Sequence, residues 1–255
     1  MRFAAPVIFG IVIGITGLAC GQDGNLQPPA AGETAQGALA DIQSKVDKIQ
    51  TLTANLEFDR KDEDDKKKKK KKANKPANPN PAWPEPPGRD VERGPLAISR
   101  GAGAKVTLER KESKEVFVAN SSDIWKYDVD DKEAQHIPAS WPVIDKYVSN
   151  ALRMNIFVAM DPETLKLKGT ESINGVPCWV IEGKSPSTLG SLGADPTKMK
   201  LWISKEDGIP RLISVPSEKD TKIWLKDVKL NQPVDASQFQ FTVPAGVETK
   251  NIFGF

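Results

Sequence analysis

The stretch that decides the fold class is Asp-Ala-Ser-Gln-Phe-Gln-Phe-Thr-Val-Pro-Ala-Gly-Val, residues 235–247. Phe239 and Phe241 are two residues apart, so in an extended chain their side chains point to the same face of a sheet. Pro244 and Gly246 follow, and both residue types end strand pairing. We therefore expect a final edge strand at 238–242. Such a strand offers no catalytic group, which favours a protein that holds a ligand over one that transforms it.

Short alternating segments between turn residues extend this pattern toward the N-terminus. Apolar residues take every second position from Leu52 to Phe58 within the segment 51–60, and Asn174-Gly175 suits a tight hairpin. The sequence predicts a mainly β fold with strands at 51–60, 94–100, around 106–108, 114–119, around 125–127, 133–137, 166–171, 178–182, 198–204, 211–216, 221–230 and 238–242.

A first helix is expected from about Glu33 to Ile49. Leu39, Ile42, Val46 and Ile49 recur at spacings of three and four, which places them on one apolar stripe. The period changes to two at Thr51, so the helix is expected to run directly into a strand.

A second helix is expected from Ser140 to about Met160. Ser140 can cap it and Pro142 lies just inside. The segment is apolar over more than one stripe, and Met154 and Phe157 supply large, adaptable side chains. It is either a helix packed on the sheet or a mobile lid over an apolar pocket.

Residues 61–88 interrupt the alternating pattern. Four acidic residues at 62–65 precede seven lysines, Lys66 to Lys72, and an Asn/Pro-rich stretch follows that contains Trp83. Such a segment buries too little apolar surface to offset its ordering entropy, so we expect a disordered insertion. It is either a tolerated surface insertion or a docking arm for anionic lipid headgroups or an acidic partner.

The N-terminus carries a targeting pattern. Arg2 and an apolar run at 7–18 indicate a signal peptide at 1–19, too short to span a bilayer, with a tether at 20–32. Gly17-Leu18-Ala19-Cys20 fits lipidation at Cys20; plain cleavage and a Cys20–Cys178 disulfide are the alternatives. The signal predicts a periplasmic protein, membrane-anchored if Cys20 carries a lipid.

Composition and motifs argue against catalysis. The 36 Lys and Arg residues against 34 Asp and Glu give a net charge of +2, so no global field draws the chain to nucleic acid. His136 has no nearby acid at useful sequence spacing, and two cysteines cannot supply the four ligands of a zinc site. Gly101-Ala102-Gly103 has no following helix or basic residue, so it is not a phosphate loop. We expect no enzyme, no metal and no cofactor.

Four stretches together resemble a known family. They are 41–58, with a helix leading into a strand; 116–127, ending in Trp125-Lys126-Tyr127; 201–211, with Asp207-Gly208-Ile209-Pro210-Arg211; and the terminus at 239–247. In this order they are similar to the LolA-type outer-membrane lipoprotein carriers and their LolB-like relatives. The resemblance covers most of residues 34–60 and 90–250, within an expected domain at 33–250 followed by a tail at 251–255.

The resemblance implies a strongly curved antiparallel sheet that forms an unclosed half-barrel with covering helices. Its concave face would hold the acyl chains of a lipoprotein, received from an inner-membrane donor and passed to an outer-membrane acceptor by a monomeric carrier. Arg100 matches an arginine that gates the family's cavity, although Gly101 stands where the family usually has proline. The expected cavity-wall residues are Leu96, Ile98, Val106, Leu108, Val116, Val118, Met154 and Phe157.

Two other functions use the same fold. Periplasmic regulators with this half-barrel detect lipids or mislocalised lipoproteins and bind a partner protein, usually with a second domain. A purely structural envelope protein would have a filled core and no ligand.

Overall fold

The computed structural model describes residues 26–61, 89–110, 113–138, 160–185, 197–216 and 220–251. Several predicted features lie outside these ranges: the signal peptide, Cys20, the Lys66–Lys72 run with Trp83, the second helix up to residue 159 with Met154 and Phe157, and the last four residues.

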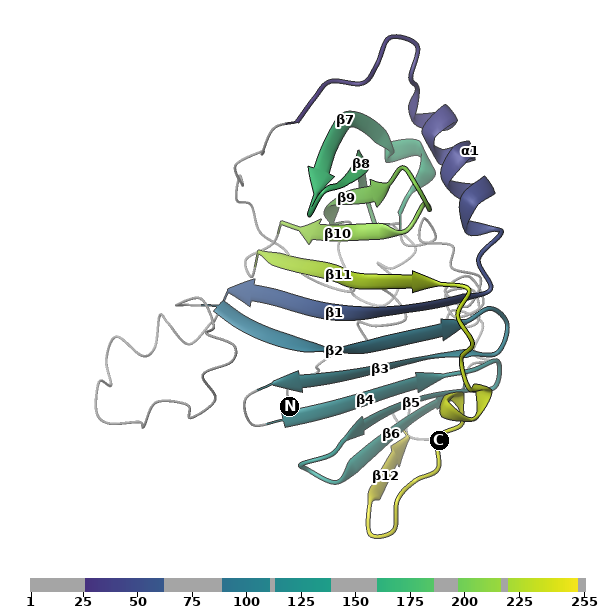
Figure 1. Cartoon of the computed structure of the whole chain (residues 1–255). Helices are drawn as coiled ribbons and strands as arrows, with labels where there is room; N and C mark the ends of the chain where they lie inside the picture. The colour runs from purple at the N-terminus through teal and green to yellow at the C-terminus, as the bar shows by residue number, and fades with distance from the viewer. Residues whose placement is uncertain are drawn as a thin grey trace, which may run out of the picture.

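A single curved sheet dominates the described structure (Figure 1). Its strands are β1 (Thr51–Lys61), β2 (Arg89–Ser99), β3 (Gly103–Arg110), β4 (Ser113–Ala119), β5 (Asp123–Asp128), β6 (Glu133–Pro138), β7 (Lys166–Ile173), β8 (Val176–Lys184), β9 (Lys198–Ser204), β10 (Pro210–Val215), β11 (Thr221–Leu230) and β12 (Glu248–Asn251). The remaining described elements are α1 (Ala35–Val46) and two short 3-10 helices, η2 (Pro162–Thr164) and η4 (Ala236–Phe239).

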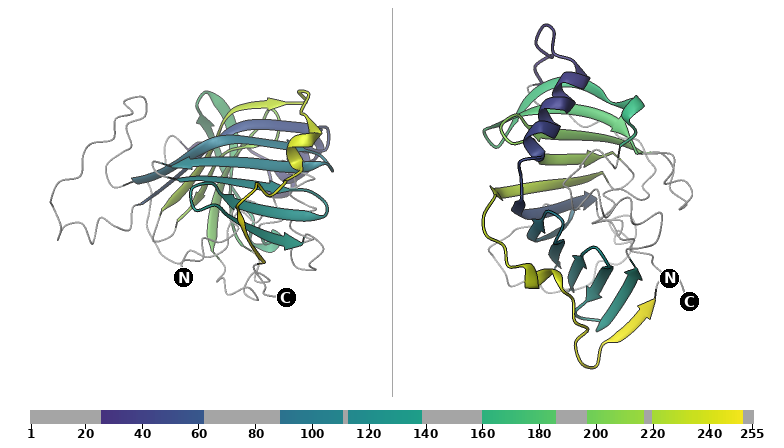
Figure 2. Two further views of the ribbon diagram at one scale, coloured as in Figure 1. Left: turned by 90° about the horizontal axis from the view of Figure 1, so that it is seen from below. Right: turned by 90° about the vertical axis from the view of Figure 1, so that its right-hand side faces the viewer.

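The strand order leaves the sheet open. The twelve strands follow the order β12-β6-β5-β4-β3-β2-β1-β11-β10-β9-β8-β7, so β12 and β7 form the two edges. Each neighbouring pair is antiparallel except β12 and β6, which run parallel. Seen end-on in the right-hand view of Figure 2, the sheet bends into a C with a convex and a concave face. The predicted curved, unclosed sheet is confirmed.

Local sequence explains where strands turn and bend. Asn174 and Gly175 have φ angles of 50° and 83°, which join β7 to β8 through the tight hairpin predicted from this dipeptide. The pairing of β1 with β11 shifts register between Thr53 and Asn55, opposite Asp227 with a φ of 51°. Irregular pairing of this kind increases strand twist and bending, which helps a long sheet to curl.

The β1–β2 pair shows how the chain accommodates the insertion. Lys61 at the end of β1 lies opposite Arg89 at the start of β2, and the pairing continues without a break to Thr51 and Ser99. The strands therefore form an in-register hairpin across residues 62–88. Strand β2 begins five residues before the predicted start at Gly94.

Helix α1 lies across one end of the C, beside the hairpin between β9 and β10 (Figure 2). Thr34 caps its N-terminus by accepting a hydrogen bond from the Gly37 backbone N–H at 3.0 Å. Ile42 and Val46 of the predicted stripe are buried, whereas Leu39 is only partly buried. The helix is shorter than predicted at both ends, and a four-residue turn at 47–50 separates it from β1, so the expected direct run from helix into strand is not seen.

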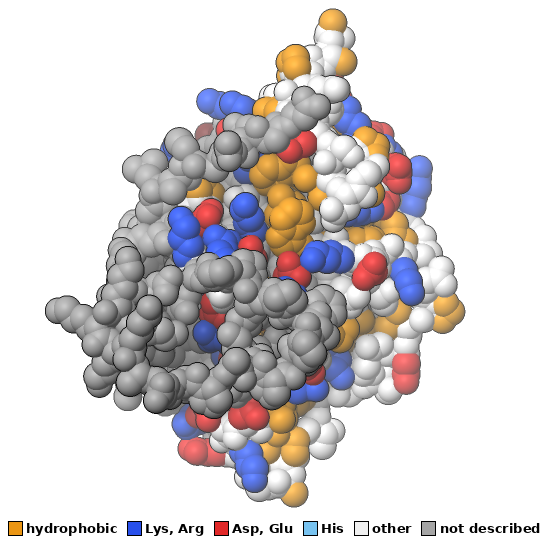
Figure 3. Space-filling model, turned by 60° about the vertical axis from the view of Figure 1, so that its left-hand side comes forward, with side chains coloured by type: hydrophobic (Ala, Val, Ile, Leu, Met, Phe, Trp, Pro, Cys, Tyr) orange, Lys and Arg blue, Asp and Glu red, His pale blue; other side chains and the backbone are white. Residues whose placement is uncertain are grey.

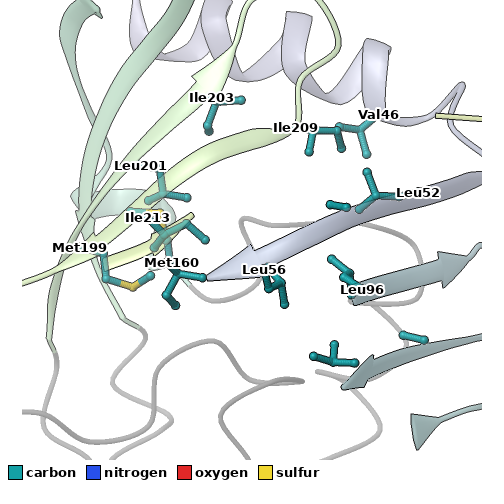
Figure 4. Close-up of a cluster of buried hydrophobic side chains, with 14 of the residues drawn as sticks. Val46, Leu52, Leu56, Leu96, Met160, Met199, Leu201, Ile203, Ile209 and Ile213 are labelled. Carbon is teal, nitrogen blue, oxygen red and sulfur yellow. The ribbon is translucent and has the colours of Figure 1, made fainter. Parts of the chain in front are cut away.

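Alternation along each strand separates the two faces of the sheet. On β1, Leu52, Ala54, Leu56 and Phe58 are buried on the concave side. The main hydrophobic core joins them to buried residues of α1 and of nine other strands, several of which are drawn in Figure 4. The core thus follows the inner surface of the C.

The prediction of a final strand at 238–242 is wrong. Phe239 closes the 3-10 helix η4, whose first turn forms because the Asp235 side chain accepts a hydrogen bond from the Ser237 backbone N–H at 2.9 Å. Such a local side-chain bond competes with strand pairing. After a turn at Gly246 with a φ of 78°, the chain forms β12 at 248–251, which pairs in parallel with β6. The terminal strand therefore lies ten residues beyond its predicted start.

Candidate functional site

The concave face of the sheet carries the larger of the two buried hydrophobic clusters among the described residues. Its buried strand residues are Leu52, Ala54, Leu56, Phe58, Leu96, Ala104, Val106, Leu108, Phe117, Ala119, Ile124, Ile137, Trp179, Ile181, Met199, Leu201, Ile203, Ile213, Val215 and Ile223. Figure 4 shows that labelled side chains from β1, β2, β9 and β10 converge there with Met160. Met160, at the end of the predicted second helix, is 1% exposed.

The predicted cavity-wall residues divide between the two faces. Leu96, Val106 and Leu108 are buried on the concave face, and Ile98 packs against them partly buried. Leu96 lies opposite Val106 in the β2–β3 pairing, which places both on one side.

Val116 and Val118 do not face the concave side. They pair with Thr107 and Lys105, whereas Val106 pairs with Phe117. Because successive strand residues point to opposite faces, the two valines lie on the convex face. Phe117, which the prediction missed, takes the concave position between them.

Arg100 joins the sheet to the C-terminal end of α1. Its Nε donates to the backbone oxygen of Ile49 at 2.7 Å, and its Nη2 donates to that of Val46 at 2.6 Å. Carbonyls at a helix C-terminus have no partner within the helix and carry partial negative charge. Arg100 therefore caps α1 and ties the covering helix to the loop after β2.

Replacing Arg100 by glutamine is expected to lower the free energy of unfolding by about 2–3 kcal/mol, because two charge-assisted hydrogen bonds to partly buried carbonyls are lost. Arg100→Lys keeps the charge but reaches one carbonyl at a time, so its free energy of unfolding should lie between those of the parent and the glutamine variant. Urea unfolding measures both variants, and amide exchange in α1 should quicken in the same order. A glutamine variant within about 0.5 kcal/mol of the parent, inside the usual range of surface substitutions, would contradict this role.

Trp179 provides a second attachment between α1 and the sheet. Its Nε1 donates to Glu33 Oε1 at 2.6 Å, and Lys205 Nζ lies 3.2 Å from the same oxygen. Lys45 of α1 lies over the indole ring at 5.0 Å from its centroid. The hydrogen bond from Trp179 is the main cause that lowers the pKa of Glu33, so this carboxylate stays charged. Both ends of α1 are thus held by polar contacts to the sheet.

The opposite end of the concave face carries charged side chains. Arg60 pairs with Glu92 and, at 3.5 Å, with Asp90; Arg110 pairs with Asp90 at 2.6 Å; Lys126 pairs with Glu115 at 2.9 Å. Burial raises the pKa of Glu92, with nearby Asp90 and Glu115 adding to the effect and Arg60 opposing it. The concave surface therefore changes from apolar to ionic where β2 begins and β3 ends. No local sequence pattern indicates this cluster.

His136 has an acidic partner, contrary to the prediction. Its Nε2 lies 2.6 Å from Asp123 Oδ1, and its ring stacks on Trp125 with 4.3 Å between centroids. The β5–β6 hairpin brings Asp123 close although it lies 13 residues away in the sequence.

Cys178 is a free thiol with no exposed surface, whereas Cys20 lies outside the described residues. Burial raises the pKa of this thiol to about 11. It is thus a packing residue with little thiolate at neutral pH.

Across the described ranges, no three His, Cys, Asp or Glu residues cluster as metal ligands do. Among the same residues, no helix combines the length and apolar character needed to span a bilayer.

No protein-family model and no curated protein sequence matches the chain. Several solved structures, however, are similar to the described fold. An uncharacterised conserved protein from Thermus thermophilus has a TM-score of 0.50 and 12% identity, covering 85% of this chain and 98% of its own. At this identity the likeness shows a shared fold alone.

Two further structures are similar at lower scores. The Mycobacterium tuberculosis lipoprotein LppX has a TM-score of 0.45 and 13% identity, covering 79% of this chain and 97% of its own. A domain from Vibrio parahaemolyticus assigned to the outer membrane lipoprotein-sorting proteins has a TM-score of 0.36 and 10% identity, covering 81% of this chain and 95% of its own.

Proposed function

We propose that this protein binds acyl chains on the concave face of its half-barrel and carries an acylated lipoprotein through the cell envelope. The observation that carries the proposal is the continuous apolar surface from β1 to β6 and from β8 to β11, on the inner side of a sheet that does not close. A closed, filled barrel would bury such a surface permanently, whereas an unclosed one can open it to a ligand.

The energetics suit transport without covalent chemistry. Each methylene moved from water to an apolar surface contributes about 0.8 kcal/mol, so part of one acyl chain gives useful affinity. A ligand held by burial alone can be released when the covering elements move. No reacting group is required of the concave face.

Helix α1 is the covering element whose attachments are described. Arg100 holds its C-terminal end through the carbonyls of Val46 and Ile49, and Trp179 holds the residue before its N-cap through Glu33. Opening at this end would break these few polar contacts. We therefore assign Arg100 a gating role, in which exchange of its carbonyl bonds for water accompanies uptake or release.

The location and partners follow from the same proposal. A signal peptide at 1–19 places the mature chain in the periplasm, where an inner-membrane donor would load the carrier and an outer-membrane acceptor would unload it. Lipidation at Cys20 would make it a tethered lipid handler.

Native mass spectrometry with lipid extraction tests the proposal. The chain from Gly21 onward keeps every described residue and can be expressed in a Gram-negative periplasm. We expect co-purified acylated species that stay bound under native conditions and dissociate on unfolding. A homogeneous apo mass, together with no uptake of an added fluorescent fatty acid, would contradict the proposal and favour a filled core.

A further inference from the structure

A second apolar cluster lies on the convex face of β7–β11, away from the proposed acyl-chain site. Its buried members are Ile173, Cys178, Val180, Trp202 and Leu212, and Leu26, Val176 and Trp224 pack against it partly exposed. Figure 3 shows hydrophobic side chains on this side of the molecule with Lys and Arg side chains beside them. Apolar side chains on the outer side of a half-barrel cannot serve a ligand held inside it.

Lysines surround this cluster. The strands β7 to β11 carry Lys166, Lys168, Lys184, Lys198, Lys200, Lys222, Lys226 and Lys229. Lys222 and Lys226 flank Trp224 along β11, and Lys200 lies over the Trp202 ring at 4.9 Å from its centroid. Two acids lie among them: Glu171 on β7 is opposite Cys178, and Glu182 on β8 is opposite Lys166 and Lys200. We call this surface, the eight lysines with Trp202 and Trp224, the convex basic face.

Several of these charges are not neutralised within the described structure. Lys168 pairs with Glu182 at 3.6 Å and Lys226 with Glu57 at 2.9 Å. Among the described residues, no ion pair joins an acid to Lys198, Lys222 or Lys229, of which Lys198 and Lys229 are exposed. Lys184 lies directly opposite Lys198 in the β8–β9 pairing. Like charges at opposed positions destabilise a sheet, so the arrangement favours an anionic partner over a folding role.

The N-terminal segment reaches the folded domain at this same face. Leu26 packs against the convex cluster, and Gln27 exchanges two backbone hydrogen bonds with Thr170 on β7, at 2.9 and 2.8 Å. Cys20 lies six residues before Leu26, a distance of at most about 20 Å in extended chain. A lipid on Cys20 would therefore hold a membrane surface close to the convex basic face.

We propose that the convex basic face docks on an anionic phospholipid surface, with Trp224 at the headgroup level and the N-terminal segment directing it there. Tryptophan is enriched at membrane–water interfaces because its ring has an apolar body and a polar N–H. Lysines near an anionic surface contribute about 1 kcal/mol each. Docking in this orientation keeps the concave face directed away from the bilayer.

Vesicle binding tests the proposal in the chain from Gly21 onward. The triple variant Lys198→Glu, Lys222→Glu, Lys229→Glu is compared with Lys48→Glu, Lys105→Glu, Lys132→Glu, which has the same charge change at positions of matching exposure outside the face. With phosphatidylglycerol-containing vesicles we expect the first variant to lose on the order of 100-fold in affinity and the second much less. Binding by the parent should weaken with salt and be absent on phosphatidylcholine alone.

Quenching of tryptophan fluorescence by bromine-labelled phosphatidylglycerol adds a positional readout. Trp224→Phe is expected to remove a substantial part of the quenching by vesicles while binding persists. Equal loss of affinity in both triple variants, or a parent chain that binds neutral vesicles as well as anionic ones, would overturn the proposal. Bound acyl species are measured on the same samples, because docking and acyl-chain retention can fail independently.

Discussion

Replacing Leu108 by aspartate is expected to abolish retention of acyl chains. Leu108 is 5% exposed on the concave face, so a carboxylate there would lie in an apolar environment beside Glu115, its partner on β4. Burying a charge without a compensating partner costs several kcal/mol. An acyl chain that covered this carboxylate would remove it from water, so this cost would oppose binding. We expect at least a tenfold fall in bound acyl species, measured by lipid extraction from the purified variant, since about 1.4 kcal/mol corresponds to tenfold.

A second variant and a control make this result interpretable. Ile98 lies on the same face but is only partly buried, so Ile98→Asp should fold more readily and still lose the ligand. Val116→Asp introduces the same group on the neighbouring strand but on the convex face, and should retain the ligand. If the Ile98 and Leu108 variants both fold and retain acyl chains as the parent does, the concave face is not the binding site.

The sequence predicted which residues of a strand share a face wherever one face is polar. In 51–59, apolar and polar residues alternate strictly, and the buried set on β1 matched the prediction. In Val116-Phe117-Val118 all three residues are apolar, so alternation cannot indicate which face is concave. The β3–β4 register decides it by pairing Phe117 with Val106.

Side-chain contacts between strands could not be predicted from the sequence, because they also depend on strand register. His136 and Asp123 meet because the β5–β6 hairpin brings together residues that no local motif joins. The ionic cluster around Glu92 forms because the start of β2 lies between the ends of β1 and β3, which depends on the register across the insertion. A resemblance to a family could suggest Arg100, whose backbone-carbonyl partners leave no sequence pattern of their own.

The predicted position of the C-terminal strand is wrong because of a local side-chain interaction. The alternation of Phe239 and Phe241 suggested a strand, but Asp235 and Ser237 favour a capped turn before them. The turn places Phe239 on Gly103, where an added Cβ would lie 2.5 Å from the Phe239 Cβ. A glycine that makes room for an aromatic ring is visible only once both positions are known.

Phe239→Ala is expected to lower the free energy of unfolding by about 3–5 kcal/mol, the usual range for a fully buried phenylalanine. Phe239 has no exposed surface, and its backbone oxygen accepts a hydrogen bond from Asn120 Nδ2 at 3.1 Å, so the residue fixes η4 to the ends of β3 and β4. Phe241→Ala is the matched comparison. Phe241 is partly exposed and touches Trp125 at 5.2 Å between centroids, so its loss should cost much less.

Urea unfolding of the two variants measures the difference, and amide exchange in β12 shows whether the terminal strand is released with η4. We expect β12 to exchange faster in Phe239→Ala, because Phe239 is a fully buried anchor of the segment from η4 to β12. Gly103→Ala should act in the same direction by crowding the ring from the other side. Equal and small costs for Phe239→Ala and Phe241→Ala would mean that the C-terminal segment lies outside the cooperative unit of the sheet.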